Sequence, residues 1–210
     1  MKKLLNAISF LCVVATFSFI SCNLSSAPSN VNTEEGIKSG DIIFQINPKG
    51  QGKAIQLATG SKFTHCGVIF IEGGDTMVYH AVNPVKKSKF KDFITMGVES
   101  EYWIKRLNRN LSDLEIKNMK KYAISQLGKR YDIKFRWSDN EMYCSEYVWK
   151  IYHNGAGVDV GSPKQMKEYA LSNPIVQSIM KKRYGKNIPM DEKMIAPGDI
   201  YDFSELVPLN

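Results

Sequence analysis

Residues 65–82 have the sequence pattern of a β-hairpin, which predicts how two strands of the fold pair. Two segments rich in β-branched and aromatic residues, 65–71 and 77–82, are separated by a Gly-Gly pair that lies between Glu72 and Asp75. A Gly-Gly pair in this setting favours a two-residue hairpin turn, because that turn needs positive φ angles at its central residues. The sequence therefore predicts two antiparallel strands in which Glu72 pairs with Asp75.

This register places two histidines on one face of the sheet. If the turn is as predicted, His65 lies opposite Val82 and Gly67 lies opposite His80. Side chains alternate between faces along a strand, so His65 and His80 become diagonal neighbours roughly 7–8 Å apart. Cys66 then points to the opposite face. A change of one residue in the turn would separate the two histidines.

Other segments complete the expectation of an α+β domain. The clearest helix begins at Ser112, which forms a capping box with Glu115. The remaining elements are predicted as a strand at 42–45, a helix at 53–59, a strand at 102–107, a helix from 144 to about 153 that stops at Gly155, a helix that starts at 162–165 and is interrupted at 173–174, and a last strand at 199–203. Strands followed by helices favour an antiparallel sheet packed against helices.

The N-terminus has the pattern of an export signal. Lys2 and Lys3 precede an apolar stretch, 4–20, which ends at the small residue Ser21. An uncleaved membrane anchor is one alternative, because the apolar stretch is marginally long enough to span a bilayer. The segment that ends in Cys22 resembles a bacterial lipobox, in which this cysteine carries the lipid and becomes the mature N-terminus. A plain secretory signal with an incidental cysteine is the other alternative.

The expected organisation is a lipoprotein signal peptide at 1–21, a flexible tether at 22–36 and one domain at 37–210. Removal of the signal takes away two lysines and no acidic residue, which lowers the formal net charge from +7 to +5. The mature protein is expected to be lipid-anchored on the bacterial cell envelope, where a basic surface favours anionic lipids or acidic wall polymers. Nothing in the sequence predicts binding to nucleic acid, and no obligate protein partner is evident.

Cys144 is the candidate nucleophile. It stands in the first turn of a predicted helix, where the backbone amides and the helix dipole favour the thiolate. His65 is the candidate general base and acid, and His80 would orient its ring as the third member of a triad. The backbone N–H groups around Cys144 and Ser145 are candidates for holding an oxyanion. This chemistry needs no metal or organic cofactor, and a zinc site from these side chains would lack close ligand spacing.

The cysteine count leaves two thiols in the domain. Cys12 is removed with the signal and Cys22 is the lipidation candidate, so Cys66 and Cys144 remain. Two such thiols in an exported protein can form a disulfide. Cys66 is expected to point away from the histidine face, so Cys144 cannot easily meet both the histidines and Cys66. The enzyme and disulfide interpretations are therefore expected to exclude one another.

Four short motifs in a fixed order carry a resemblance to a known family. They are Ser39-Gly40-Asp41-Ile42-Ile43-Phe44, Thr59-Gly60-Ser61-Lys62-Phe63-Thr64-His65-Cys66-Gly67-Val68, Gly128-Lys129-Arg130-Tyr131-Asp132 and Tyr143-Cys144-Ser145-Glu146-Tyr147-Val148. From residue 39 to about 168 the chain resembles the circularly permuted papain-like amidohydrolases of the YiiX/YaeF type, relatives of the NlpC-type cell-wall peptidases. In that family the histidine strand precedes the cysteine helix, as it does here.

The resemblance implies Cys144 as nucleophile and His65 as its base. Many members carry glutamate where this chain has His80, whereas a histidine third member is familiar from the related lecithin:retinol acyltransferase group. The choice between hydrolysis and acyl transfer therefore stays open. The candidate substrate-binding residues in the family-like motifs are Tyr131, Tyr143, Ser145 and Glu146.

The sequence thus predicts an envelope-anchored cysteine amidohydrolase or peptidase that cleaves an amide bond through a Cys144 thioester. Wall peptides and aminoacyl or fatty-acyl amides are the candidate substrates. One alternative is a lipid-directed acyltransferase or thioesterase of the lecithin:retinol acyltransferase-like type. Another is a non-catalytic binding module with a Cys66–Cys144 disulfide.

Overall fold

The structure, a computed structural model, describes residues 36–47 and 51–209 of the chain. The predicted signal peptide, the lipidation at Cys22 and nearly all of the tether lie outside the described residues. Within the described part, no helix has the length and apolar character needed to cross a membrane.

An antiparallel sheet of six strands forms the centre of the domain, in the order β10–β5–β1–β2–β3–β4. Its strands are β1 (Ile42–Gln45), β2 (His65–Glu72), β3 (Asp75–His80), β4 (Lys86–Lys89), β5 (Trp103–Leu107) and β10 (Leu206–Pro208). Two short pairs lie outside this sheet, β6 (Arg130–Tyr131) with β7 (Glu141–Met142) and β8 (Lys164–Gln165) with β9 (Lys193–Met194). The predicted α+β class with an antiparallel sheet is confirmed.

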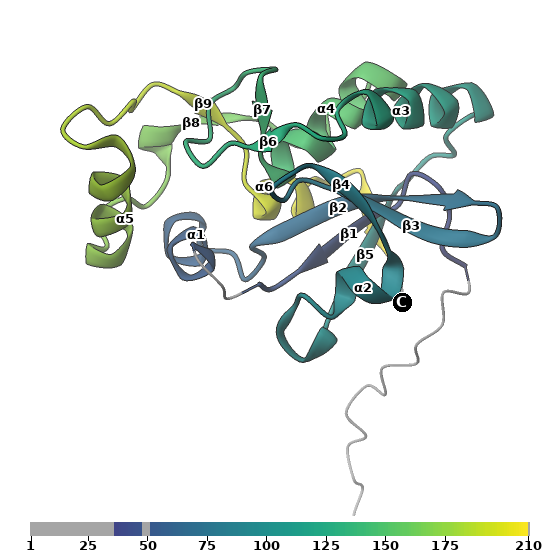
Figure 1. Ribbon diagram of the computed structural model, residues 1–210, viewed down its shortest axis with the longest axis horizontal. Coiled ribbons are helices and arrows are strands. Elements are labelled where there is room, and N and C mark those ends of the chain that lie inside the picture. Colours follow the sequence, from purple (N-terminus) through teal and green to yellow (C-terminus); the bar gives the residue numbers. More distant parts are fainter. Residues whose placement is uncertain (1–35, 48–50, 210) are drawn as a thin grey trace, which may run out of the picture. The chain divides into compact units, whose positions relative to one another are not determined.

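Helices cover both faces of the sheet (Figure 1). They are α1 (Gly52–Thr59), α2 (Phe90–Ile94), α3 (Asp113–Ser125), α4 (Cys144–Ala156), α5 (Pro174–Tyr184) and α6 (Pro197–Tyr201), with 3-10 turns at Val98–Ser100 and Met166–Glu168. α3 and α4 pack together, and the main apolar core lies between α4 and one face of the sheet. α2 covers the opposite face, where Phe90 and Phe93 form a smaller core with the strands.

The hairpin forms with the predicted register. Glu72 pairs with Asp75, and the ladder continues in that register as far as Val68. Both turn glycines have positive φ, as this type of turn requires. Gly67 makes room for the neighbouring strand, because a Cβ atom at this position would lie 3.1 Å from the Cβ of His80.

The helix pair α3–α4 depends on a close contact. α3 begins with the predicted capping box, in which Ser112 Oγ accepts from Glu115 N and the Glu115 carboxylate accepts from Ser112 N. α4 does not stop at Gly155 as predicted, since it continues and ends at Gly157 in the left-handed conformation. Gly155 instead allows the helices to approach, because a Cβ there would lie 2.4 Å from backbone atoms of Met119.

The C-terminal part differs from the sequence prediction in two places. The helix expected from 162–165 is absent from that stretch, which forms β8, and the helix α5 begins later at Pro174. The sequence predicts an interruption of a helix at this proline, but proline is favoured at the first position of a helix. The stretch 199–203 is not a strand, because Pro197 begins α6 and the Asp199 carboxylate caps its first turn.

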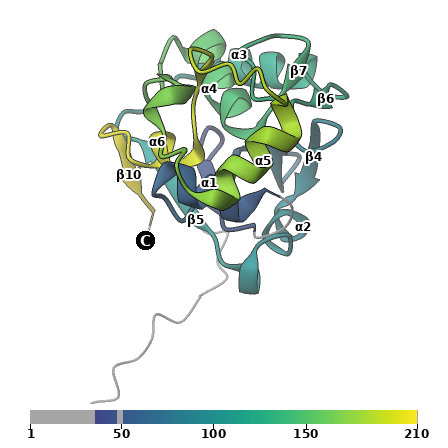
Figure 2. The same ribbon diagram turned by 90° about the vertical axis from the view of Figure 1, so that its left-hand side faces the viewer.

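α1 and α5 lie side by side at one end of the domain (Figure 2). A third apolar cluster joins them, with Ala54 of α1 packed near Val176 and Met180 of α5. Together with the first turn of α4, these two helices enclose a cavity that leads to Cys144.

Candidate active site

Cys144 lies at the first position of α4 and is 3% exposed. The N–H groups of the first helical turn have no acceptor within the helix. The first internal hydrogen bond of α4 runs from Tyr147 N to Tyr143 O. The N–H groups of Cys144 and Ser145 are therefore available to an anionic oxygen beside the thiol.

His65 and His80 meet on one face of the sheet, as the hairpin register predicts. His65 Nε2 lies 3.0 Å from His80 Nδ1, and His80 Nε2 lies 3.0 Å from Ser88 Oγ. The Nδ1 atom of His65 is left for Cys144, with which the His65 side chain shares a hydrogen bond. A continuous series of hydrogen bonds runs from Cys144 to Ser88 when His65 Nε2–H donates to His80 Nδ1 and His80 Nε2–H donates to Ser88 Oγ. In that tautomer His65 Nδ1 is free to accept the thiol proton.

Phe93 of α2 holds both imidazole rings. It stacks on His65 with 5.5 Å between ring centroids and an angle of 22°, and it meets His80 edge-on at 5.1 Å and 82°. His80 is 0% exposed. This burial, followed by the charges of His65 and Lys86, lowers the pKa of His80 to about 2. His80 therefore stays neutral and remains an acceptor for His65 throughout a proton transfer.

Sequence reasoning assigned no role to Phe93 or Ser88. Both lie in the segment 83–100, for which no element was predicted, and the structure places β4 and α2 there. The available signal was the spacing of Phe90 and Phe93, three residues apart, which marks one apolar face of a short helix.

Cys66 lies on the face opposite His65 and His80, as predicted, because it packs in the core against α4 whereas the histidines pack against Phe93. The prediction that Cys144 cannot meet both the histidines and Cys66 is wrong, because Cys66 also contacts Cys144. Its thiol hydrogen-bonds to the Cys144 side chain, and its backbone N–H donates to the same sulfur. Cys66 pairs with Phe44 of β1, whereas the ladder between β2 and β3 ends at Val68, which leaves the β3 side of this strand end open. Cys144 lies at the start of β2, where the His65 side chain on one face of the strand and the Cys66 side chain on the other both reach its sulfur atom. Both thiols are free, so contact with His65 and contact with Cys66 do not exclude one another.

The contacts of Cys144 and Cys66 and their burial shift the pKa values of the two thiols in opposite directions. The hydrogen bond from the Cys66 side chain lowers the pKa of Cys144 well below its ordinary value, and the hydrogen bond and charge of His65 act in the same direction against burial. Burial, followed by the contact with Cys144, raises the pKa of Cys66 well above its ordinary value. Cys144 is therefore the thiol that ionises, and Cys66 keeps its proton and donates.

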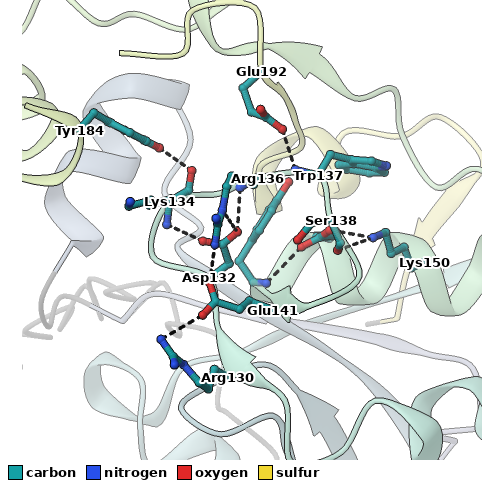
Figure 3. A network of polar contacts seen from close by, with 12 residues as sticks. Arg130, Asp132, Lys134, Arg136, Trp137, Ser138, Glu141, Lys150, Tyr184 and Glu192 are labelled. Carbon is teal, nitrogen blue, oxygen red and sulfur yellow. Dashed lines mark hydrogen bonds and ion pairs between the residues drawn. The ribbon is translucent and has the colours of Figure 1, made fainter. Parts of the chain in front are cut away.

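Tyr131 of β6 brings a hydroxyl group to the same sulfur. This hydroxyl shares a hydrogen bond with the Cys144 side chain and accepts from Gln51 Nε2 at 3.1 Å. The loop that follows is held by Asp132, which is 0% exposed and accepts from the backbone N–H of Arg136 at 3.0 Å. Figure 3 shows the Asp132 carboxylate among the polar contacts of this loop. The loop conformation thus supports the position of Tyr131.

Tyr143 and Ser145, on either side of Cys144, hold the segment that leads into α6. Ile195 N donates to Tyr143 Oη at 3.1 Å, and Ser145 Oγ donates to Ile195 O at 2.7 Å. Both residues line the cavity, as their proposed role in substrate binding requires. Glu146 does not line it, since its carboxylate is buried and lies 2.8 Å from Lys150 Nζ. That position argues for a structural role of Glu146 in the first turn of α4.

The cavity beside Cys144 is largely apolar. Its apolar lining from α1, α5 and the loop between β8 and α5 includes Ala54, Ile55, Leu171, Val176, Ile179 and Met180. Gln51, Tyr131 and Arg183 are among its polar lining residues. A cavity of this composition suits an apolar group whose orientation is determined by a few polar contacts.

The chain shares its fold and much of its sequence with known proteins. The family described as permuted papain-like amidase enzyme, YaeF/YiiX, C92 family, matches residues 36–206. The chain belongs to this family. It is 43% identical over 169 residues to the uncharacterized protein YiiX of Escherichia coli (strain K12), in a match that covers 80% of this chain and 84% of that protein.

A solved structure is similar over most of the domain. It is described as the crystal structure of metalloprotein yiiX from Escherichia coli O157:H7, and it matches with a TM-score of 0.80 and 42% identity, over 82% of this chain and 96% of that chain. Family membership and this likeness confirm the resemblance drawn from the four motifs and the permuted papain-like fold. The family is one of amidases.

Proposed function

We propose that this protein is a cysteine amidohydrolase that cleaves an amide bond through a thioester on Cys144. The observation that supports this most strongly is the convergence of several groups on one sulfur atom. The start of α4, the His65 side chain and the Cys66 thiol and N–H all contact or adjoin the Cys144 sulfur. The His65 ring is in turn held by His80, whose Nδ1 lies 3.0 Å away. Each contact favours the thiolate or orients the base that forms it.

In the first half of the proposed reaction, the Cys144 sulfur attacks the amide carbonyl carbon and its proton passes to His65 Nδ1. The N–H groups of Cys144 and Ser145 hold the oxyanion. The imidazolium keeps its orientation because His65 Nε2–H still donates to neutral His80. The carbon–nitrogen bond then breaks as His65 returns the proton to the leaving amine, which leaves an acyl group on sulfur.

In the second half, His65 takes a proton from a water molecule, and the hydroxide attacks the thioester carbonyl carbon. The carbon–sulfur bond breaks, the acid product leaves, and the proton on His65 restores the thiol of Cys144. The same residue thus acts as base and acid in both halves, as a single imidazole can.

The apolar cavity supports a substrate with an apolar group close to the scissile bond, such as a fatty-acyl amide, an aminoacyl amide or a wall-peptide fragment with an apolar side chain. The same cavity, together with the histidine at position 80, favours one second candidate. This is acyl transfer from a lipid-like donor to an acceptor other than water. The thioester stage is common to both reactions, and only the group that attacks it differs.

A metal has no part in the proposed mechanism. The related Escherichia coli structure is described as a metalloprotein. In this chain, His65 and His80 direct ring nitrogens at each other instead of at a shared ligand. Across residues 36–47 and 51–209, no three His, Cys, Asp or Glu side chains are grouped so that they could hold a metal ion. The residues present therefore do not fit a metal centre.

The export signal and the cysteine at position 22 support a location on the cell envelope, with the domain tethered to the membrane by lipid. The test is metabolic labelling with a fatty-acid analogue, followed by fractionation, for wild type and Cys22→Ser. Label and membrane association that persist in Cys22→Ser would contradict the lipidation.

The catalytic proposal is tested with a panel of N-acyl and peptide amides in which the apolar group is varied. Intact mass spectrometry should show wild type gaining the mass of the acyl group, and Cys144→Ala and His65→Ala should gain none. Turnover that is unchanged in Cys144→Ala would contradict the mechanism. Added amines and alcohols that accelerate acyl release and appear in the product would identify acyl transfer in place of hydrolysis.

Thiol counting on the unreduced, exported protein tests the remaining alternative. Two titratable thiols in the mature domain, at Cys66 and Cys144, are the result expected for the enzyme, in agreement with the free thiols of the structure. A Cys66–Cys144 disulfide in the exported protein would favour the non-catalytic binding module.

A further inference from the structure

Gln51 and Arg183 meet at the edge of the active site, although the mechanism above assigns neither a role. Gln51 directly precedes α1, Arg183 lies in the last turn of α5, and both line the cavity beside Cys144. Arg183 Nη2 donates to Gln51 Oε1, and Gln51 Nε2 donates to Tyr131 Oη at 3.1 Å. The Tyr131 hydroxyl is the group that shares a hydrogen bond with Cys144. The four side chains form a continuous hydrogen-bonded row that ends at the nucleophile.

The direction of each bond follows from which groups can donate and which can accept. A guanidinium has N–H donors and no acceptor, so the Gln51 atom that faces Arg183 must be the carbonyl oxygen. The amide nitrogen of Gln51 then faces Tyr131 and donates to its oxygen. The Tyr131 oxygen is the acceptor in that bond. Its single hydrogen is therefore left for the Cys144 sulfur.

Tyr131 keeps the proton that it donates, and Arg183 keeps its hydrogen bond to Gln51. Burial raises the pKa of Tyr131 well above its ordinary value, so the phenol retains its hydrogen at neutral pH. The Arg183 guanidinium lies 4.8 Å from the centre of the Phe135 ring. None of the ion pairs found among the described residues includes Arg183. Its bond to Gln51 therefore has no competing carboxylate in this part of the chain.

We propose that Gln51 and Arg183 are positioning residues, which direct the hydroxyl hydrogen of Tyr131 onto the Cys144 sulfur and so stabilise its thiolate. This Arg183–Gln51–Tyr131 relay rests on the proposed function of Cys144 as nucleophile, and it gives α5 a part in thiol reactivity. Without Arg183, the amide of Gln51 is free to turn its oxygen toward Tyr131. The hydroxyl hydrogen would then be drawn to Gln51 and lost to the sulfur.

The variant Gln51→Glu tests the relay because it keeps the size of the side chain and reverses one bond. Both carboxylate oxygens accept, so Arg183 stays bound while the Tyr131 hydroxyl turns toward the new carboxylate. The measurement is the rate of Cys144 alkylation by iodoacetamide against pH, with the labelled site read by mass spectrometry. Alkylation at pH 6 should become about tenfold slower or more, as for loss of a hydrogen bond to a charged group, and the curve should move to higher pH. Thermal stability should be unchanged or increased, because a new ion pair with Arg183 forms.

Two further variants separate the relay from the direct effect of a new negative charge. Tyr131→Phe should move the alkylation curve as Gln51→Glu does, and the two changes combined should move it no further. An additional displacement in the combined variant would show that the new charge acts on the thiol directly, which overturns the relay. Wild-type alkylation in Gln51→Glu would overturn it as well. Arg183→Met should give a smaller displacement in the same direction, and no displacement would remove Arg183 from the proposal.

Alkylation reports on the thiol and needs no substrate, which distinguishes this inference from the proposed function. Relay-dependent alkylation in a protein that hydrolyses none of the amides would sustain the relay and overturn the proposed function. Amide hydrolysis through Cys144, together with an alkylation rate that is the same in wild type and Gln51→Glu, would sustain the proposed function and overturn the relay. A wild-type alkylation curve with the ordinary pH dependence of a free thiol would overturn both.

Discussion

Replacement of Lys150 by methionine should destabilise the protein in a manner that depends on pH. Lys150 Nζ lies 2.8 Å from the Glu146 carboxylate and 2.8 Å from Asp139 Oδ1. It also donates to Ser138 O at 2.8 Å (Figure 3). Glu146 is 0% exposed and Lys150 is 7% exposed, so this ion pair is buried. Removal of one partner of a buried pair costs about 3–5 kcal/mol, because the other charge is left without compensation.

The pH dependence follows from Glu146. Burial raises its pKa from an ordinary 4.5 to about 7, against the opposing influence of Lys150. A carboxyl with a raised folded-state pKa contributes its full share of stability below the unfolded pKa, and this share is lost as the pH rises through the folded pKa. In Lys150→Met the folded pKa of Glu146 rises further. The difference from wild type should therefore be largest near pH 8, where the variant must protonate Glu146 or bury its charge. At pH 5 the carboxyl is mostly protonated in both proteins, and only the contacts with Ser138 and Asp139 are lost.

Urea unfolding at pH 5 and pH 8 measures this difference. At pH 8, Lys150→Met should lose about 3–5 kcal/mol, which corresponds to a decrease in Tm of roughly 6–20 °C for a domain of this size. The double variant Lys150→Met/Glu146→Gln should recover most of the loss, since no buried charge remains. Lys117→Met, at an exposed position on α3, is the matched control and should change stability by less than about 0.5 kcal/mol. Equal destabilisation at both pH values, or a double variant as unstable as the single one, would refute the argument.

Three further predictions concern the site and its support. Cys66→Ala should slow alkylation of Cys144 at pH 6 more than Cys66→Ser does, because serine keeps a donor beside the sulfur; identical alkylation curves for the two variants would contradict this. Ser88→Ala leaves His80 Nε2 without its acceptor and should lower kcat about tenfold with little change in KM, measured on a substrate found in the amide panel. An unaltered kcat would show that the hydrogen bond from His80 to Ser88 has no effect on the reaction. Gly155→Ala forces a Cβ against the backbone of α3 and should cost about 1–3 kcal/mol or more in thermal unfolding; a Tm within 1 or 2 °C of wild type, roughly the shift for half a kcal/mol, would show that the helices can separate freely.

The parts of the fold that were predicted correctly depend on local rules. The Gly-Gly turn determines the pairing of Glu72 with Asp75, and strand alternation then brings His65 and His80 to one face. The capping box at Ser112 likewise needs only residues within one helical turn. Such features are encoded by neighbours along the chain, so they can be read without knowledge of the tertiary structure.

The errors arose where one local pattern fits two structures. The pattern predicts a helix end at Gly155, but a glycine inside a helix also permits close approach of a second helix, and only the position of α3 decides between them. The pattern predicts an interruption at Pro174, although proline both ends a helix and begins one. The stretch 199–203 contains isoleucine, tyrosine and phenylalanine, which favour strands, yet the preceding Pro197 and the cap from Asp199 favour a helix.

The contacts of Tyr131 with Gln51, and of Gln51 with Arg183, could not be predicted, because they join segments far apart in the sequence. Gln51 is separated by 80 residues from Tyr131 and by 132 residues from Arg183. No periodicity or motif links such positions. The contact between Cys66 and Cys144 has a related cause. Strand alternation does place Cys66 and His65 on opposite faces of β2, but the N-terminus of α4 lies at the end of the strand, where both side chains reach the Cys144 sulfur. Local sequence thus predicts the candidate nucleophile and base, whereas the proposed role of Gln51 and Arg183 and the cavity beside Cys144 depend on the tertiary contacts of α1 and α5.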